Sequence, residues 1–474
     1  MTVEVEVKSE ETTQVAEVVV PQDDQQQQQQ EASDKKLSAA VGEEREAEAD
    51  AEAQKENGDV PCESPSPNIV EKSSSFKEES NHPADLKGSE RKALNELKSK
   101  LEEAIAAETL FKKGEEEAAE AVAEEEKGEV SLWGVPLSPS KGSEGTDVVL
   151  LKFLRARDFK VADAFEMLKK TLQWRRDSKI DAILGEDVAP ELAPAAYLDG
   201  TDREGHPVCY NIYGVFGDEE MYQKTFGSEE KKERFLRWRV QLMEKGIEKL
   251  DLRPGGVLSL LQINDLKNAP GPTKKDLRAA TKEAVNLLQD NYPELVARNI
   301  FINVPFWYYA IHSLLSPFLT QRTKSKFVFA RPARATDTLL KYIPAEEIPV
   351  RYGGFKREND LEFSSKDGAV SELSVKPGST ETIEIPIYEV GSTLIWDLTV
   401  LGWEVNYKEE FVPADEGSYT IIVQKGKRMS GNEGPLRNTF QNNEPGKVVL
   451  TVENVSSKKK RVLYRHQTKK CSSF

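Results

Sequence analysis

The residue types that most often carry catalysis or bind metal ions are few in this sequence and widely separated. The 474 residues include three cysteines and four histidines. They are Cys62, Cys209 and Cys471, and His82, His206, His312 and His466. Neither set forms a CxxC or HExxH pair, so the sequence predicts no metal site and no disulfide framework.

The glycine and serine motifs of nucleotide-binding and hydrolytic enzymes do not occur in the sequence either. No predicted strand is followed by GxxxxGK[ST] or GxGxxG, and there is no GxSxG elbow. Gly255-Gly256 precedes a strand as a turn, and Gly353-Gly354 ends a domain. Because no nucleophile or ligand pair is placed for reaction, we expect a protein that is not an enzyme, without catalytic residues or a cofactor.

An aromatic segment from Pro305 to Leu319 offers a different chemistry. It follows a predicted strand and precedes the basic residues Arg322 to Lys326. As a helix it would be apolar on nearly every face, which is typical of a helix buried in the core. A movable lid over an apolar cavity is the alternative. Polar residues and a proline interrupt the segment, so no transmembrane segment is predicted.

The charge of the chain is divided unevenly along the sequence. The whole chain has 65 Lys+Arg and 82 Asp+Glu residues, a net charge of −17. Residues 1–130 hold 35 acidic and 15 basic side chains, whereas residues 131–474 hold 47 and 50. We therefore expect no nucleic acid to bind the acidic part, while the rest can meet an anionic partner. The acidic N-terminus has no apolar stretch, so no signal peptide is predicted and a cytosolic setting is expected.

The N-terminal part is expected to have little fixed structure. Residues 1–90 include a run of glutamines and few apolar side chains, which predicts disorder. From residue 91 to 126 alanine, glutamate, lysine and leucine dominate, with apolar residues at helical spacing. We interpret this stretch as a solvated helix within the acidic tail; a short coiled coil that binds a partner is the alternative.

The elements that must position any site begin near residue 132. Two helical segments are predicted within residues 146–176, separated by a break at 157–160. Strands and helices then alternate, which predicts a largely parallel, buried sheet with right-handed connections. The predicted strands are Pro207–Phe216, Val257–Asn264, Asn299–Val304 and Ser325–Ala330, and the helices between them are Lys231–Leu250 and Thr273–Asp290.

After residue 366 the pattern changes to short, mostly alternating apolar runs. Glycine, proline, asparagine or aspartate separates them, and no helical period occurs. This pattern predicts an antiparallel β-sandwich of roughly 100 residues. The predicted strands are Ile383–Ile387, Leu394–Val400, Trp403–Tyr407, Tyr419–Val423, Val448–Val452 and Val462–Tyr464.

Several ordered motifs resemble the Sec14-like (CRAL-TRIO) lipid-transfer family. They are Leu151–Arg157, Asn291–Glu294, Asn303–Pro305, Pro317–Leu319, Ile343–Glu346 and Pro349–Gly354. The β-sandwich resembles a GOLD domain, and an acidic tail, a Sec14-like domain and a GOLD domain together resemble the plant patellin arrangement. The resemblance implies four parts: a disordered acidic tail over 1–130 with a helix at 91–126, a helical N-terminal subdomain over 131–185, an α/β lipid-binding domain over 186–360, and a GOLD β-sandwich with a basic C-terminus over 366–474.

The resemblance also implies residues that hold a phosphoinositide headgroup. In family members that bind phosphatidylinositol, an Arg in the first motif, the Glu of Tyr-Pro-Glu, and a Thr and a Lys before the last strand do so. The matching residues are Arg157, Glu294, Thr323 and Lys326. Arg and Lys suit phosphate oxygens, and Glu and Thr suit inositol hydroxyls. Alternatively, Arg157 is a surface residue and Glu294 pairs with Arg298. Asp158 stands where some members have a basic residue, which leaves the acceptance of further phosphates open.

By the same resemblance, the aromatic segment is the gate of a lipid cavity and opens at a bilayer. We expect the gate and acyl pocket to be lined by Phe306, Trp307, Tyr308, Tyr309, Leu314, Leu315 and Phe318. A bound phospholipid is then the ligand. The C-terminal basic residues Lys458, Lys459, Lys460 and Arg461 are expected to dock on an anionic membrane, or are simply solvated. Cys471 has the spacing of a weak prenylation box.

The resemblance thus implies a phosphoinositide carrier that transfers or presents lipid between membranes. It would be a cytoplasmic, peripheral membrane protein at the plasma membrane or cell plate, acting in trafficking linked to cell-plate formation during cytokinesis. The two Ser-Pro pairs of residues 64–67 suit phosphorylation by proline-directed kinases. The alternative is an adaptor whose GOLD domain binds a cargo or membrane protein, with the lipid domain as a sensor. A third, enzymatic interpretation predicts turnover of the bound lipid.

Overall fold

The computed structural model describes residues 76–111, 130–141, 143–271, 273–305, 308, 322, 325–364, 369–402, 404–429 and 433–470. The glutamine run, the Ser-Pro pairs and Cys471 lie outside these residues. So do Thr323 and the aromatic segment apart from Pro305 and Tyr308, so the predictions made for them stay predictions. Among the described residues, no helix is both long and apolar enough to cross a bilayer.

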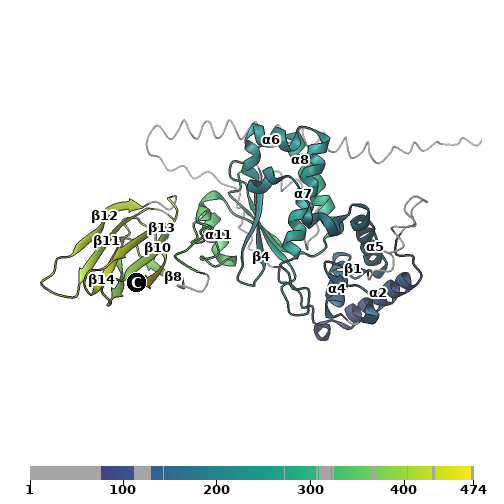
Figure 1. The fold of residues 1–474 in the computed structure, drawn as a ribbon, viewed down its shortest axis with the longest axis horizontal. Helices are drawn as coiled ribbons and strands as arrows, with labels where there is room; N and C mark the ends of the chain where they lie inside the picture. The colour runs from purple at the N-terminus through teal and green to yellow at the C-terminus, as the bar shows by residue number, and fades with distance from the viewer. Residues whose placement is uncertain are drawn as a thin grey trace, which may run out of the picture. The chain divides into compact units, whose positions relative to one another are not determined.

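Three helices form a helical subdomain around one apolar core (Figure 1). They are α2 (Gly88–Ala106), α4 (Glu144–Ala156) and α5 (Val161–Asp177), and the short strands β1 (Ser131–Leu132) and β2 (Val135–Pro136) lie between α2 and α4 in the sequence. The prediction of a solvated helix is wrong, because Leu94, Leu97 and Leu101 of α2 are buried in this core. The leucines at helical spacing thus form a face that packs on α4 and α5, and α2 belongs with this subdomain.

The prediction of disorder is also wrong for residues 76–90. The Pro83–Asp85 turn (η2) leads into α2, and residues just before it make hydrogen bonds with parts of the chain more than 70 residues away. The polar composition that predicted disorder supplies charges instead. Those charges pair with a distant part of the fold, which local composition cannot reveal.

The central sheet has the strand order β3-β4-β5-β6-β7. Its strands are β3 (Ala196–Thr201), β4 (Pro207–Ile212), β5 (Leu260–Asp265), β6 (Val296–Ile302) and β7 (Phe327–Phe329). The last four strands are parallel and β3 is antiparallel, so the predicted α/β domain with a largely parallel sheet is confirmed. The strand β3 was not predicted.

Helices cover both faces of this sheet (Figure 1). The helices are α6 (Glu219–Phe226), α7 (Glu229–Ile247), α8 (Lys275–Asn291) and α11 (Ala335–Tyr342). Leu339 of α11 packs with Tyr210 and Ile263 on one face. Leu260, at the start of β5, packs instead with Val240 and Met243 of α7. The sheet therefore lies between helices packed on its two faces.

The C-terminal part is an antiparallel β-sandwich of two four-stranded sheets, as predicted. One sheet has the order β13-β10-β15-β8 and the other β12-β11-β14-β9. The strands are β8 (Ser371–Val375), β9 (Thr380–Ile387), β10 (Thr393–Leu401), β11 (Val405–Pro413), β12 (Ile421–Met429), β13 (Leu436–Gln441), β14 (Gly446–Glu453) and β15 (Lys460–Lys469). Trp396, Tyr407 and Phe411 are buried between the sheets.

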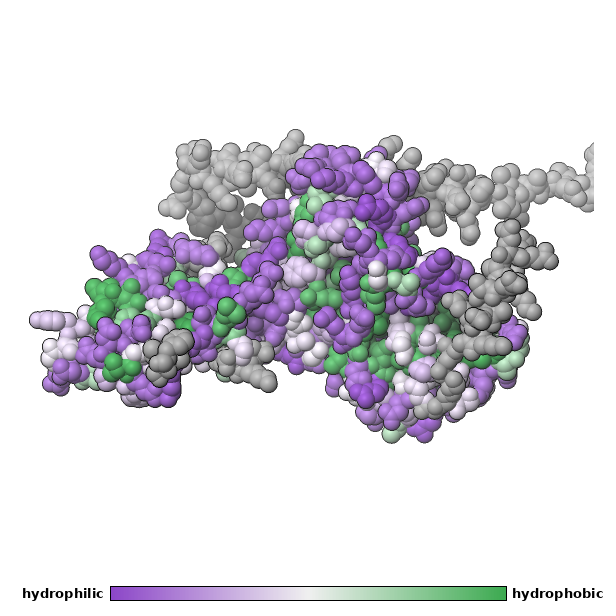
Figure 2. Space-filling view, in the orientation of Figure 1, coloured by the Kyte–Doolittle hydropathy of each residue, from purple (hydrophilic) through white to green (hydrophobic). Residues whose placement is uncertain are grey.

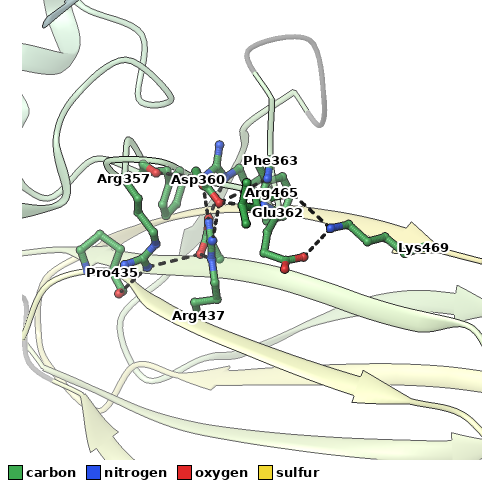
Figure 3. A network of polar contacts seen from close by, with 11 residues as sticks. Arg357, Asp360, Glu362, Phe363, Pro435, Arg437, Arg465 and Lys469 are labelled. Carbon is green, nitrogen blue, oxygen red and sulfur yellow. Dashed lines mark hydrogen bonds and ion pairs between the residues drawn. The ribbon is translucent and has the colours of Figure 1, made fainter.

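An ionic network fastens residues 355–363, which precede the sandwich, onto β10, β13 and β15 (Figure 3). Asp397 is fully buried and accepts hydrogen bonds from Arg437 and Arg465, both at 2.7 Å. Asp360 accepts from Arg437 at 2.7 Å, and the guanidinium of Arg465 lies 4.1 Å from the centre of the Phe363 ring. The segment is therefore held to the sandwich by paired charges that are largely removed from water.

Candidate functional site

Four basic side chains gather where α4 meets the strands β6 and β7. They are Lys152, Arg155, Arg322 and Lys326, called the basic cluster below. Lys152 and Arg155 lie three residues apart in α4 and so project from one face of that helix. Lys326 directly precedes β7. The fold thus brings two segments more than 160 residues apart in sequence to one place.

Glu294 is the acidic centre of this arrangement. Its Oε1 lies 2.8 Å from Nε of Arg322, and its Oε2 lies 2.8 Å from Nζ of Lys326. Burial opposes ionisation, but the hydrogen bonds from Arg322 and the charge of Lys326 outweigh it and lower the pKa of Glu294 to about 2. The carboxylate therefore stays charged at any physiological pH and holds both cations in place.

The backbone at Glu294 is in the left-handed region, with φ of 53°. A non-glycine residue there costs roughly 1 kcal/mol, and such strain is concentrated at functional sites. The strained turn follows Pro293 and directs the side chain toward the basic cluster, while the carbonyl oxygen accepts a hydrogen bond of 2.8 Å from Nζ of Lys152. The Tyr-Pro-Glu motif therefore contributes both its side chain and its carbonyl.

Lys152 is the most deeply buried member of the cluster, with 3% of its surface exposed. Its ammonium also donates to the carbonyl oxygen of Leu258 at 2.8 Å. Burial lowers the pKa of Lys152 to about 7, although Glu78 and Glu294 nearby favour the charged form. An additional anion beside this amine would raise the pKa again, because a negative charge favours the protonated form.

The structure brings together two of the four residues predicted to hold the headgroup. Glu294 and Lys326 are in contact, whereas Thr323 lies outside the described residues. Arg157 donates a hydrogen bond to the carbonyl oxygen of Ala156, and no contact joins it to Glu294 or Lys326. Arg155, two residues earlier, lies in the cluster instead. Helical geometry is the signal that identifies it, because Arg155 shares its face with Lys152 whereas residue 157 follows the last residue of α4.

The predicted alternative for Glu294 is not what the structure shows. Arg298 lies near Glu204, with 3.8 Å between nitrogen and oxygen, and donates to the carbonyl oxygen of Phe76 at 3.1 Å. Arg322 was not predicted to take part in the site. It is the first residue of the basic stretch that follows the aromatic segment, and the structure pairs it with Glu294.

The C-terminal basic residues differ from one another. Lys458 and Lys459 are exposed, as membrane docking requires. Arg461 is paired with Glu372 at 2.7 Å and with Asp337 at 3.0 Å. Lys460 is only 1% exposed, so the prediction that it docks on a membrane is wrong. It begins β15 and points inward because strand residues alternate between two faces.

A cavity with an apolar lining lies between β4, α7 and α8, on the face of the sheet opposite α11. Its walls include Phe216, Phe235, Trp238, Ala284 and Leu288. Its volume is about 40 Å³, whereas ligand cavities usually measure roughly 300–1,000 Å³. An acyl chain would therefore have to push these walls apart. Figure 2 shows hydrophilic residues over much of the visible surface of this domain, in keeping with an interior that is apolar.

Comparison with protein families gives the same division of the chain. Residues 93–170 match the model of the CRAL/TRIO N-terminal domain, and residues 194–354 match the CRAL/TRIO domain. Residues 376–460 match the Patellin-1-like, C-terminal GOLD domain. Fold and family models together define a Sec14-like CRAL/TRIO protein with a C-terminal GOLD domain.

Individual relatives narrow this class. Patellin-4 of Arabidopsis thaliana is 54% identical in a match that covers 86% of this chain and 92% of that protein. Patellin-3 of the same plant is 49% identical and covers 83% of this chain and 78% of its own. The phosphatidylinositol transfer protein sfh5 of Emericella nidulans is 29% identical over 52% of this chain and 62% of its own. The chain belongs to the patellin family.

Proposed function

We propose that this protein is a non-enzymatic carrier that binds a phosphoinositide and transfers or presents it at membranes. The observation that carries this proposal is the basic cluster built around Glu294 in a CRAL/TRIO domain. Arg155, Arg322 and Lys326 would meet phosphate oxygens, because guanidinium and ammonium groups bind them by charge-assisted hydrogen bonds. The name of the sfh5 relative, a phosphatidylinositol transfer protein, supports the same ligand class.

The cavity and the basic cluster would make different contributions to lipid binding: the cavity binds the acyl chains and the cluster binds the headgroup. Burial is worth about 0.8 kcal/mol per methylene, so two acyl chains of roughly 30 methylenes lose about 24 kcal/mol on entering water. An apolar interior that encloses the chains offsets a cost of that size, and the cavity between β4, α7 and α8 is where it would open. Charge-assisted headgroup contacts of roughly 1.5–3 kcal/mol each then select among lipids.

Two arginines at the end of α4 provide a matched test of the headgroup site. Vesicle flotation would compare phosphatidylcholine vesicles with and without phosphatidylinositol 4-phosphate. Arg155→Ala and Lys326→Ala should each weaken phosphoinositide-dependent binding about tenfold. Arg157→Ala removes the same charge two residues away and should bind like the wild type. If Arg157→Ala is the variant that loses binding, the assignment to Arg155 fails; if none does, the site is not here.

We also propose that the protein works as a peripheral membrane protein of the cytoplasm, at the plasma membrane or the cell plate, in trafficking linked to cytokinesis. This part rests on the patellin resemblance. Exposed Lys458 and Lys459 support it, because each basic residue near an anionic leaflet is worth about 1 kcal/mol. Imaging of a fluorescent fusion in dividing plant cells tests it, and a signal that stays diffuse throughout cytokinesis would contradict it.

The second candidate function is an adaptor, favoured by apolar residues exposed on the sandwich. Tyr419, Ile422 and Tyr388 are 92%, 60% and 78% exposed. All three residues lie at the same end of the sandwich. The strand register shows this, because the end of β9 pairs with the start of β14, and the end of β11 pairs with the starts of β12 and β14. A chain ending at residue 354 separates the functions. If it restores cellular function alone, the adaptor hypothesis fails.

A further inference from the structure

The residues just before η2 lie directly on the basic cluster. We call residues 76–81, with the sequence Phe-Lys-Glu-Glu-Ser-Asn, the acidic segment. The carboxylate of Glu79 accepts two parallel hydrogen bonds from Arg322, at 2.8 and 2.9 Å. Its Oε2 also lies 3.1 Å from Nε of Arg155. One carboxylate thus joins two of the guanidinium groups that we assign to phosphate binding.

The rest of the guanidinium of Arg155 is also used by the acidic segment. Its Nη2 donates to the carbonyl oxygen of Ser80 at 2.7 Å, and its Nη1 donates to Oδ1 of Asn81. Only 9% of Arg155 is exposed. A phosphate group from outside therefore reaches these donors only after residues 79–81 have moved away.

Glu78 holds the segment on its other side. Its Oε2 lies 3.0 Å from Nε2 of His206, and its Oε1 accepts a hydrogen bond from the hydroxyl of Ser259. Burial opposes the charge of Glu78, but the hydrogen bonds from His206 and Ser259 outweigh it and lower its pKa to about 2. The two neighbouring carboxylates of the segment are therefore both engaged with the folded domain.

An aromatic ring completes the cover. The ring centre of Phe76 lies 4.7 Å from Nζ of Lys326 and 5.5 Å from the guanidinium carbon of Arg322. Cations over an aromatic face at these distances are attracted to the ring and are shielded from water. The carbonyl oxygen of Phe76 accepts a hydrogen bond of 3.1 Å from Arg298. Arg155, Arg322 and Lys326 therefore each contact the acidic segment, and Lys152 contacts Glu294.

We propose that the acidic segment is an internal ligand of the basic cluster, which competes with the phosphate groups of a phosphoinositide for the same donors. Carboxylate and phosphate both match the planar fork of arginine, so Glu79 occupies the geometry that a phosphate would take. The inference rests on the proposed function, because it assigns the same cluster to the headgroup. It adds that the site is closed until the segment leaves.

Tethering makes this competition strong but reversible. A short connection through η2 joins the segment to α2, so its effective concentration at the site is on the order of millimolar. A ligand that binds only the open form shows an affinity reduced by the fraction of open molecules. A headgroup with several phosphates, presented by a membrane, has more charge than Glu79 and can displace it. Lipid loading and release of the acidic segment would then be coupled.

The test uses the full-length chain and two probes that share phosphate chemistry. Soluble inositol 1,4,5-trisphosphate is titrated by calorimetry, and phosphatidylcholine vesicles with phosphatidylinositol 4-phosphate are used for flotation. Glu79→Gln and Phe76→Ala should each lower the Kd about tenfold with both probes. Glu102→Gln removes the same charge from an exposed position of α2 and should leave both Kd values unchanged. Thermal unfolding confirms that each variant is folded.

The outcomes separate this inference from the proposed function. If Lys326→Ala loses binding while Glu79→Gln and Phe76→Ala bind like the wild type, the internal ligand is refuted and the headgroup site stands. If Lys326→Ala binds normally with both probes, the headgroup site itself is refuted. A gain with vesicles alone would show general repulsion from the membrane, which contradicts competition at the site. Independently of the variants, trisphosphate should speed amide hydrogen exchange in residues 77–81, and unchanged exchange would contradict displacement.

Discussion

Glu294 and Lys326 contact each other at 2.8 Å although 32 residues separate them. Glu294 precedes β6 and Lys326 precedes β7, and these two strands are parallel neighbours in the sheet. The ion pair therefore ties together the amino ends of two adjacent strands. Side-chain exposures of 15% and 11% show that both charges are largely removed from water, so each depends on the other.

Replacing Glu294 by glutamine should destabilise the domain. The change leaves Lys326 and Arg322 without their carboxylate in a partly buried site, which costs about 2–3 kcal/mol. Urea denaturation of the two proteins measures the free energy of unfolding directly. Glu283→Gln, at an exposed position of α8, is the control and should change it by less than about 0.5 kcal/mol. Equal stability of Glu294→Gln and the wild type would show that the pair contributes nothing to the fold.

The two buried groups His206 and Lys152 should change the free energy of unfolding in opposite directions as the pH rises. Burial opposes the charge of His206, but Asp202 and Glu78 outweigh it and raise its pKa from 6.5 to about 9. Its contribution is therefore complete below about pH 6.5 and is lost as the pH rises to 9. Burial lowers the pKa of Lys152 from 10.5 to about 7. Because the unfolded chain keeps that proton up to higher pH, this group makes stability rise between pH 7 and 10.5.

The wild type should therefore have a nearly constant free energy of unfolding between pH 7 and 9. In His206→Gln only the effect of Lys152 remains, so the free energy of unfolding should rise with pH by up to about 1.4 kcal/mol per pH unit. In Lys152→Met only the effect of His206 remains, so the free energy of unfolding should fall with rising pH at a similar slope. Exposed His82→Gln serves as the control and should parallel the wild type. Parallel curves for all four proteins would mean that neither group titrates differently in the folded state.

The sequence supports the fold much better than the exact composition of the site. Periodicity of apolar residues identified the parallel sheet and the sandwich, since burial of alternate or successive side chains follows directly from it. The strands β8 and β13 were missed because SELSV and LRNTFQ are polar for strands of a sandwich. They lie at the edges of their sheet and bury little, as their exposed and half-buried residues show.

The site was harder to predict because its contacts join distant segments. A resemblance placed Glu294 and Lys326 together, which the structure also does. It did not decide between Arg155 and Arg157, since that choice depends on the face of α4 and on the residue where the helix ends. Nothing in the local composition of residues 76–81 distinguishes them from a disordered acidic tail, because their partners lie up to 243 residues away.

Asp397 should be essential to the sandwich. It is fully buried and balances Arg437 and Arg465, with Arg357 at 3.4 Å as a third cation. Asp397→Asn leaves these cations without their buried carboxylate and should cost about 3 kcal/mol. Guanidinium chloride unfolding, followed by amide hydrogen exchange in β10, β13 and β15, reports on the sandwich.

The matched control is Glu384→Gln in the same sandwich. Glu384 pairs with Lys447 at 2.8 Å, but 54% and 41% of the two side chains are exposed. Such surface pairs contribute less than about 1 kcal/mol because water and salt screen them. Similar losses for Asp397→Asn and Glu384→Gln would show that the buried network has no special role in stability.

Lys460 should behave unlike its exposed neighbours Lys458 and Lys459. Its Nζ has no hydrogen-bond partner among the described residues, and burial lowers its pKa. Lys460→Met keeps the length of the side chain and removes an unpaired buried amine, so it should stabilise the sandwich by about 1 kcal/mol. Flotation with anionic vesicles should be unchanged for this variant, whereas a Lys458→Ala, Lys459→Ala double variant should bind more weakly. A loss of vesicle binding by Lys460→Met, with the fold intact, would show that Lys460 does contact the membrane.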